Sequence, residues 1–340
     1  MNERLITFIE NSFLKELILN KDITDISYNG VSVFYQHNKK GRMKSAIKVS
    51  QNEVTDFIRQ IANFAERQFS FSTPILDVSV GRYRINAVHP AIVRVGDDKA
   101  CSFAIRIGSL ESRIKYDKNF ISKEALNYLD ESLNNGESLV ISGPTGAGKT
   151  ELQKYLLSRL RKNSRIIVID NIQELDNVRI NDDLDITSWQ ISPNNPAGSA
   201  LELIRNALRS NPDWLIVAEA RGPEMLDVFN SMLTGHPIIT TIHAQNLESM
   251  PVRMTRMIMM ADKRTDYNKI ADDLNEHLHF YVYLNKSENP DGSINRYIEE
   301  VGEMTRDGDF NILYSAITGE YSQISKQGRK LLKLTGDEPK

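Results

Sequence analysis

Eight residues near the middle of the chain have the types and spacing of a phosphate-binding loop. They are Gly143-Pro144-Thr145-Gly146-Ala147-Gly148-Lys149-Thr150, the pattern G-x-x-x-x-G-K-T. Glycines allow the backbone to curl around phosphates and to direct N–H groups at them, at a helix N-terminus whose dipole favours anions. We expect Lys149 to reach the β- and γ-phosphates and the Thr150 hydroxyl to bind Mg²⁺. The octet therefore predicts a nucleoside triphosphate site.

Further residues that could do chemistry follow other apolar strands. One strand runs into Glu219, a second into Asp170 with Glu174 four residues later, and a third into His243, seven residues after His236. Ligands of parallel sheets bind at the carboxyl ends of the strands, where the octet also lies. Each acid alone is equally well explained as a solvated strand end. Three strands that all end in such residues favour a catalytic set that orients water or metal.

The elements that must position these residues alternate along the second part of the chain. Helices are expected near 122–133, 149–161, 198–209 and 223–234, and strands near 138–142, 165–170, 214–219 and 237–242. This alternation predicts an α/β fold, a mostly parallel sheet with helices on both faces. A helix near 246–260 is rich in methionine, which indicates core or interface packing more than a partner groove.

The first part of the chain has a different pattern. An amphipathic helix is expected over 2–19, a hairpin around Asn29-Gly30, a helix over 51–65, and strands near 76–80, 83–88 and 102–107. These elements predict a smaller α+β domain with an antiparallel sheet. We expect an N-terminal domain over residues 1–110, a linker over 111–120 and a P-loop domain over 121–340.

Composition excludes several classes of protein. No run approaches the roughly 20 apolar residues of a membrane-spanning helix, and no secretory signal is apparent at the start. One cysteine, Cys101, excludes an internal disulfide and a multi-cysteine zinc site. His277 and His279 are expected to share one face of a strand, but without a third ligand nearby they favour a structural role.

Charge is unevenly distributed along the chain. The net charge is −3, yet residues 1–115 carry 17 Lys/Arg and 12 Asp/Glu, while the remainder has a net charge of −8. The near-neutral total argues against direct nucleic-acid binding. The basic first part fits contact with an anionic membrane surface, a nucleotide or an acidic neighbour, and it fits plain scatter between two domains equally well.

The ordered motifs resemble the secretion-ATPase superfamily, which powers type II secretion, type IV pili, Tad pili and type IV secretion or conjugation machines. After the P-loop, residues 169–175 are similar to its Asp box, 208–222 to its Walker B segment, and 234–244 to its His box. Residues 81–86 and 103–106 resemble the arginine-bearing strands of its N-terminal domain. The resemblance covers nearly the whole chain.

The resemblance implies roles for these residues. The cofactors would be ATP and Mg²⁺, and Glu219 would polarise the attacking water, with Lys149 and Arg221 beside it. Asp170 and Glu174 would support metal and water, with Asp170 as a second Mg²⁺ ligand beside Thr150. His236 and His243 would sense the γ-phosphate or link subunits. A charge clamp on the nucleotide would come from the N-terminal domain, through Arg82, Arg84 and Arg106; each of these arginines could instead be an ordinary salt-bridged one.

The resemblance also implies a cytoplasmic homo-hexamer, peripheral on the membrane, that works on inner-membrane secretion or pilus platform proteins. The single cysteine excludes the zinc module of type II secretion ATPases, and the segment 281–301 is similar to the last hairpin of the type IV secretion and Tad branch. Two departures, Asp170-Asn171 for Glu-Asp and Ala218 for glycine, leave open a ring subunit with weak catalysis. A pilus extension or retraction motor and a DNA motor also stay open as functions.

Overall fold

The computed structural model of the chain describes residues 2–109, 114, 119–171, 175, 184–192, 195–262, 264–319 and 322–333. It divides into two compact units, Met1–Leu110 with Glu288–Asn295, and Glu111–Ser287 with Arg296–Lys340. We call them unit 1 and unit 2. Most of the linker predicted over 111–120 lies outside the described residues. Unit 1 includes a segment from far along the chain, in which the Ile294 N–H donates to the Lys39 carbonyl at 2.7 Å.

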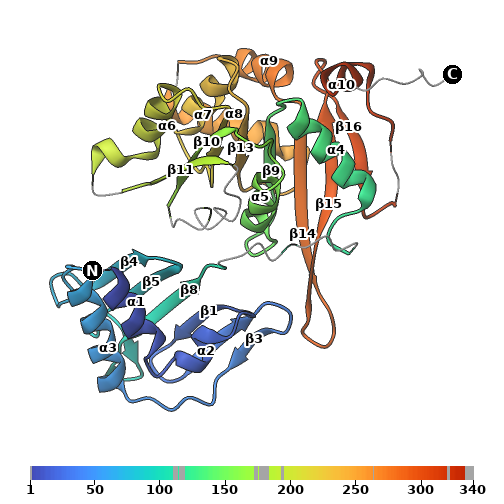
Figure 1. Cartoon of the computed structure of the whole chain (residues 1–340). Coiled ribbons are helices and arrows are strands. Elements are labelled where there is room, and N and C mark those ends of the chain that lie inside the picture. The colour runs from blue at the N-terminus through green and yellow to red at the C-terminus, as the bar shows by residue number, and fades with distance from the viewer. Residues whose placement is uncertain are drawn as a thin grey trace. The chain divides into compact units, whose positions relative to one another are not determined.

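Unit 1 is an antiparallel sheet covered on one face by helices (Figure 1). The strand order is β3-β2-β1-β8-β5-β4, with all neighbours antiparallel. Buried and exposed side chains alternate along β4, and the buried ones join the helices in one core. The strands are β1 Ile23–Tyr28, β2 Val33–His37, β3 Gly41–Lys44, β4 Ile75–Val80, β5 Tyr83–Val88 and β8 Ser102–Ile107, and β6 Arg94–Val95 pairs with β7 Asp98–Lys99. The helices are α1 Asn2–Glu10, α2 Lys15–Leu19 and α3 Gln51–Phe64.

The helix predicted over 2–19 is wrong in one respect, because it is two helices. The Ser12 hydroxyl donates to the Ile9 carbonyl and accepts from the Leu14 N–H, so side-chain bonds hold the turn in which α1 ends and α2 begins. The hairpin predicted at Asn29-Gly30 is confirmed, with Gly30 at φ +95° in the turn between β1 and β2. At this position a side chain would collide with Val95.

Unit 2 is an eight-stranded sheet in the order β11-β10-β12-β13-β9-β14-β15-β16. The six strands from β11 to β14 are parallel, and β15 pairs antiparallel with β16. The strands are β9 Leu139–Ser142, β10 Arg165–Asp170, β11 Asp185–Gln190, β12 Trp214–Val217, β13 Ile238–Thr241, β14 Phe280–Glu288, β15 Ile294–Met304 and β16 Phe310–Ser315. The predicted α/β class with a mostly parallel sheet is confirmed.

Helices cover both faces of this sheet (Figure 1). Leu139 and Ile141 of β9 face a core with α4 Lys123–Asn134 and α5 Lys149–Leu157, whereas Val140 between them faces the other core. That second core contains side chains of α6 Ala200–Leu208, α7 Met225–Leu233, α8 Ser249–Ala261 and α9 Tyr267–His277. The short helix α10 Lys326–Leu331 comes last. Strands buried on both faces explain why their sequences are continuous apolar runs.

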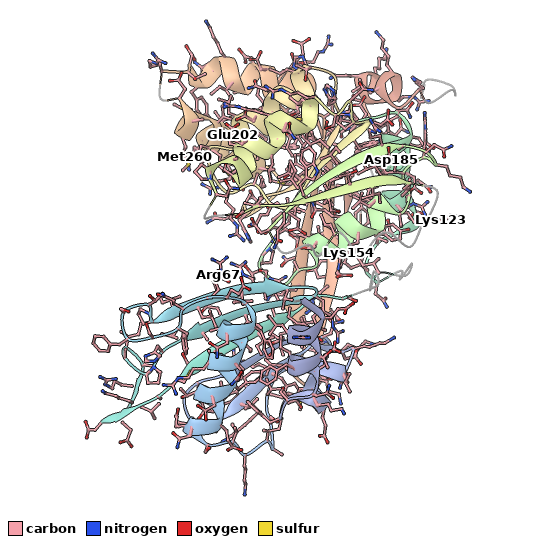
Figure 2. All side chains as sticks on the ribbon, turned by 60° about the vertical axis from the view of Figure 1, so that its left-hand side comes forward. Arg67, Lys123, Lys154, Asp185, Glu202 and Met260 are labelled. Atoms are coloured by element: carbon pink, nitrogen blue, oxygen red, sulfur yellow. The ribbon has the colours of Figure 1, made fainter. Side chains whose placement is uncertain are left out.

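Two smaller predictions have different outcomes. The methionines of α8 pack as expected: Met250, Met254 and Met257 are fully buried, and Met260 at its end is exposed (Figure 2). The shared strand face of His277 and His279 is wrong, since His277 is the last residue of α9 and His279 precedes β14. Within the described ranges, no helix is long and apolar enough to cross a membrane.

Candidate nucleotide-binding and catalytic site

The predicted P-loop connects the carboxyl end of β9 to the N-terminus of α5. Gly143 has φ +145°, and a Cβ there would collide with the backbone carbonyl of Leu284 on β14. Gly148 caps α5 in the left-handed region, at φ +102°. The loop is therefore pressed against β14 and directs the first N–H groups of α5 to one place, which is the geometry of an anion site.

Cations contact the loop backbone at four consecutive carbonyls. Lys149 Nζ donates to the carbonyls of Gly143 at 2.7 Å and Pro144 at 3.3 Å. Lys286 Nζ donates to that of Thr145 at 2.9 Å, and Arg296 Nε to that of Gly146 at 2.7 Å. Lys286 and Arg296 were not predicted as site residues; Arg296 lies in the segment that suggested the branch, and the pairing of β14 with β9 brings this hairpin to the loop.

Glu219 lies two residues beyond β12, between the side chains of Arg221 and His243. Its Oε2 is 2.7 Å from Arg221 Nη2 and its Oε1 is 3.0 Å from His243 Nε2, and its side chain is 20% exposed. The charge of Lys149 acts on both Glu219 and His243. The fold thus brings together Lys149, Glu219, Arg221 and His243, which we call the carboxyl-edge cluster.

Two hydroxyl groups at the ends of β9 and β13 bond to the backbone segments that contain Glu219 and His243. The Thr241 hydroxyl donates to the carbonyl of Ala218 at 2.7 Å, next to Glu219. The Ser142 hydroxyl donates to the Ile242 carbonyl and accepts from the Ala244 N–H, the two neighbours of His243. These bonds join the ends of β9, β12 and β13 and limit how far the two side chains can move apart.

Burial and charge act in opposite directions on the pKa of Glu219. Burial raises this pKa, but the hydrogen bond and charge of Arg221, with the charges of His243 and Lys149, lower it more, so the net pKa is below the usual value. Burial and the charges of Lys149 and Arg221 lower the pKa of His243, against the opposing charge of Glu219. At neutral pH the cluster therefore holds an ionised Glu219 and a neutral His243.

The other predicted acids lie further along the sheet. Asp170 ends β10, is buried, and its Oδ2 accepts from the Leu175 N–H at 3.2 Å. Glu174 lies outside the described residues. Thr150 is the second residue of α5, as a P-loop threonine must be to reach a metal on the phosphates. The described residues contain no group of three metal-ligating side chains. The Thr150 hydroxyl and the Asp170 carboxyl group are oxygen donors, which fits Mg²⁺, an ion that keeps several waters and is held largely by the nucleotide phosphates.

His236 is not brought to the P-loop. It precedes β13, whereas His243 follows that strand, so the two histidines lie at opposite edges of the sheet. His236 Nδ1 is 3.1 Å from the Thr234 hydroxyl, in the turn after α7. His236 is therefore not placed to sense the γ-phosphate at the P-loop of its own subunit. Its predicted role in linking subunits stays a prediction.

The three arginines of the predicted clamp lie on β5, β8 and the turn before β5. Arg84 and Arg106 are direct cross-strand partners, and Arg84 pairs with Asp77 at 3.3 Å. Arg82 Nε donates to the Tyr83 hydroxyl at 2.9 Å, and its Nη2 lies 3.4 Å from Glu10. Asp25 is the cross-strand partner of Arg106 on its other side, so acidic side chains flank both arginines. Their part in nucleotide binding remains a prediction.

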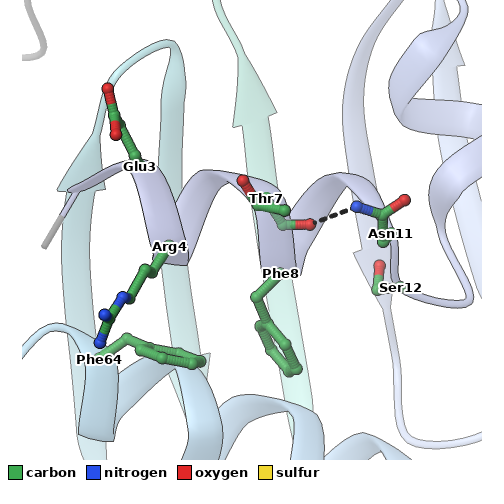
Figure 3. A pocket seen from close by; sticks show the side chains of 7 residues that line it. All are labelled: Glu3, Arg4, Thr7, Phe8, Asn11, Ser12 and Phe64. Atoms are coloured by element: carbon green, nitrogen blue, oxygen red, sulfur yellow. Dashed lines mark hydrogen bonds between the residues drawn. The ribbon is translucent and has the colours of Figure 1, made fainter.

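A surface groove in unit 1 contains none of the predicted site residues. It lies between α1 and the end of α3, and its lining combines apolar and polar side chains (Figure 3). These are Glu3, Arg4, Thr7, Phe8, Asn11, Ser12 and Phe64. The groove has no constellation that could perform phosphate chemistry.

The family model for type II/IV secretion system protein matches residues 98–278, more than half of the chain. The chain belongs to this family. An uncharacterised protein of Bacillus anthracis is 27% identical over 267 residues, 78% of this chain and 59% of that protein. The type IV secretion system protein VirB11 of Bartonella quintana is 22% identical, over 80% of this chain and 83% of that protein. The predicted resemblance to secretion ATPases of the type IV branch is confirmed.

The likeness extends to the fold. The ATPase DotB of Legionella pneumophila has a TM-score of 0.67 at 19% identity, covering 88% of this chain and 82% of that chain. The chain spans only 59%, 37% and 32% of the length of three uncharacterised relatives, from Bacillus anthracis and, for the last two, from Methanocaldococcus jannaschii.

Proposed function

We propose that this member of the secretion ATPase family hydrolyses ATP with Mg²⁺ and uses the energy to drive a membrane-embedded type IV secretion, conjugation or Tad-type pilus machine. It would work as a homo-hexamer on the cytoplasmic face of the membrane, against inner-membrane platform proteins. A contact of the basic first part with anionic lipid is included in the proposal. A motor for pilus extension or retraction belongs to the same proposal, since the site chemistry would be identical.

One observation supports the catalytic part: in the carboxyl-edge cluster Glu219 contacts Arg221 and His243, and the charge of the P-loop lysine acts on it. Lys149 would exchange its bonds to the Gly143 and Pro144 carbonyls for bonds to the phosphates. Glu219 would hold the attacking water in line and accept its proton. Arg84, Arg106 and Arg82 would add positive charge to the nucleotide. Bound Mg²⁺ would neutralise charge that develops on the phosphates.

A second candidate is a ring subunit that binds ATP and hydrolyses it weakly. The observation in its favour is the Glu219–Arg221 pair, because a carboxylate with a lowered pKa is a weaker base. Ala218 in place of glycine next to Glu219 points in the same direction.

Phosphate release from purified protein across a concentration series tests the proposal. Wild type, Lys149→Ala and the control Lys269→Ala, an exposed lysine on α9, are compared. We expect turnover per subunit to rise with concentration, to disappear in Lys149→Ala and to be unchanged in Lys269→Ala. Bound ATP without turnover at any concentration would support the weak ring subunit, and failure of the wild type to bind ATP would overturn both candidates.

A further inference from the structure

Lys286 and Arg296 come from neighbouring strands and reach one side of the P-loop. Lys286 belongs to β14 and Arg296 to β15, which are neighbours in the sheet, and β14 pairs with β9, the strand that leads into the loop. Their donors lie 2.9 Å from the Thr145 carbonyl and 2.7 Å from the Gly146 carbonyl. Neither residue is a member of the P-loop or of the carboxyl-edge cluster.

The direction of a carbonyl determines where the next N–H points. In a trans peptide the C=O of one residue and the N–H of the following residue point in opposite directions. The carbonyls of Thr145 and Gly146 face the cations, so the N–H groups of Gly146 and Ala147 face away from the hairpin. The Ala147 N–H donates across the loop to the Pro144 carbonyl at 3.2 Å, so a phosphate that binds at this N–H would replace that internal bond.

The two strand cations differ from Lys149 in what a nucleotide would do to them. Lys149 contacts loop carbonyls from its place at the start of α5, and phosphates would compete for it. Lys286 and Arg296 approach the loop from the hairpin, so their bonds to the carbonyls need not break when phosphates enter. Cations at these carbonyls favour the peptide orientation that presents N–H groups to an anion.

We propose that Lys286 and Arg296 are positioning residues. They would hold the P-loop peptides in the orientation that presents their N–H groups to the α- and β-phosphates of a nucleotide. The proposal rests on the proposed function, since it needs a nucleotide at the loop. The proposal requires that the two cations strengthen the binding of ATP and of ADP by the same factor, because both nucleotides carry these two phosphates. A cation that touched the γ-phosphate directly would favour ATP alone.

The test measures the Kd of ADP and of a non-hydrolysable ATP analogue for the full chain, by equilibrium binding at fixed salt. The variants are Lys286→Met, Arg296→Met and the double variant, with the conservative changes Lys286→Arg and Arg296→Lys. Arg264→Met is the matched control, because it also removes an exposed cation from unit 2 but one that pairs with Asp262. Nucleotide-free Tm is recorded for every variant.

We expect the double variant to weaken both nucleotides by about tenfold and by the same factor, with nucleotide-free Tm unchanged. Arg296→Lys and Lys286→Arg should retain most of the affinity, and the control all of it. Unchanged affinity in the double variant, a loss confined to the ATP analogue, or a loss accompanied by a lower Tm would overturn the proposal. Wild type that binds neither nucleotide would overturn the proposed function as well, which separates the two failures.

Discussion

At the carboxyl edge of the large sheet, His243 Nε2 lies 3.0 Å from Glu219; at the amino edge, His279 Nδ1 lies 3.4 Å from Glu137. The residue types are the same, and the surroundings are not. The His243 side chain is 47% exposed and has Lys149 and Arg221 as charged neighbours, whereas that of His279 is 7% exposed. We infer that a histidine–glutamate pair becomes a catalytic candidate through its position beside the P-loop, and that the buried pair is structural.

The largest expected difference between the two edges is the loss of turnover when the glutamate of each pair is replaced. Glu219→Gln should lower turnover by about 100-fold or more while ATP still binds, because the amide cannot accept a proton from water. Glu137→Gln should leave turnover within about twofold and lower the Tm, since it removes the carboxyl group that lies 3.4 Å from the buried His279. Steady-state phosphate release and thermal unfolding of both variants measure this. A Glu137→Gln variant as inactive as Glu219→Gln would remove the distinction.

Substitution of His243, at the carboxyl edge, should lower turnover more than substitution of His236, at the amino edge, but less than substitution of Glu219. His243→Gln should lower turnover by about tenfold, equivalent to about 1.4 kcal/mol, through loss of contact with Glu219, the proposed catalytic carboxylate. His236→Gln, at the opposite end of β13, should change turnover little at a protein concentration where assembly is complete. Measurement of kcat at saturating ATP separates these effects, and equal losses would place His236 in the site, through another subunit.

Acidic pH should act on the carboxyl edge in a defined direction. The lowered pKa of His243 means that it gains a proton only below its ordinary value of 6.5, while Glu219, also lowered, stays ionised to below 4.5. Turnover should be level from pH 8 to about 6.5 and should fall below that, as protonated His243 draws Glu219 into an ion pair. In His243→Gln this decline should disappear. A decline that persists in that variant would assign it to another group.

The smallest effect separates two neighbouring threonines of β13, both buried. The Thr241 hydroxyl donates to the Ala218 carbonyl, whereas the Thr240 hydroxyl has no hydrogen-bond partner among the described residues. Thr241→Val should lower the free energy of unfolding by about 1–3 kcal/mol, and Thr240→Val should leave it unchanged or raise it. Chemical denaturation measures both. Equal destabilisation would mean that the Thr241 bond does not stabilise the edge.

Local pattern was sufficient for much of the fold and for part of the site. Apolar runs predicted the strand over 165–170 to the residue, and the octet predicted the loop between β9 and α5. Lys286 and Arg296 were missed because their place depends on β14 pairing with β9, a contact between strands about 140 residues apart that no local pattern encodes. His236 does not reach the P-loop of its own subunit for a local reason: seven residues can span a strand, so the two histidines of one motif lie at opposite edges of the sheet.

The segment Glu288–Asn295 has a consequence for how the chain is made. The Ile294 N–H donates to the Lys39 carbonyl, and both belong to unit 1. A ribosome adds about 5–20 residues per second, so roughly ten to fifty seconds separate the synthesis of these two partners. Over that interval residues 1–110 exist without residues 288–295, while the P-loop region between them is synthesised. Unit 1 therefore begins to be synthesised before unit 2 and is completed only after most of unit 2.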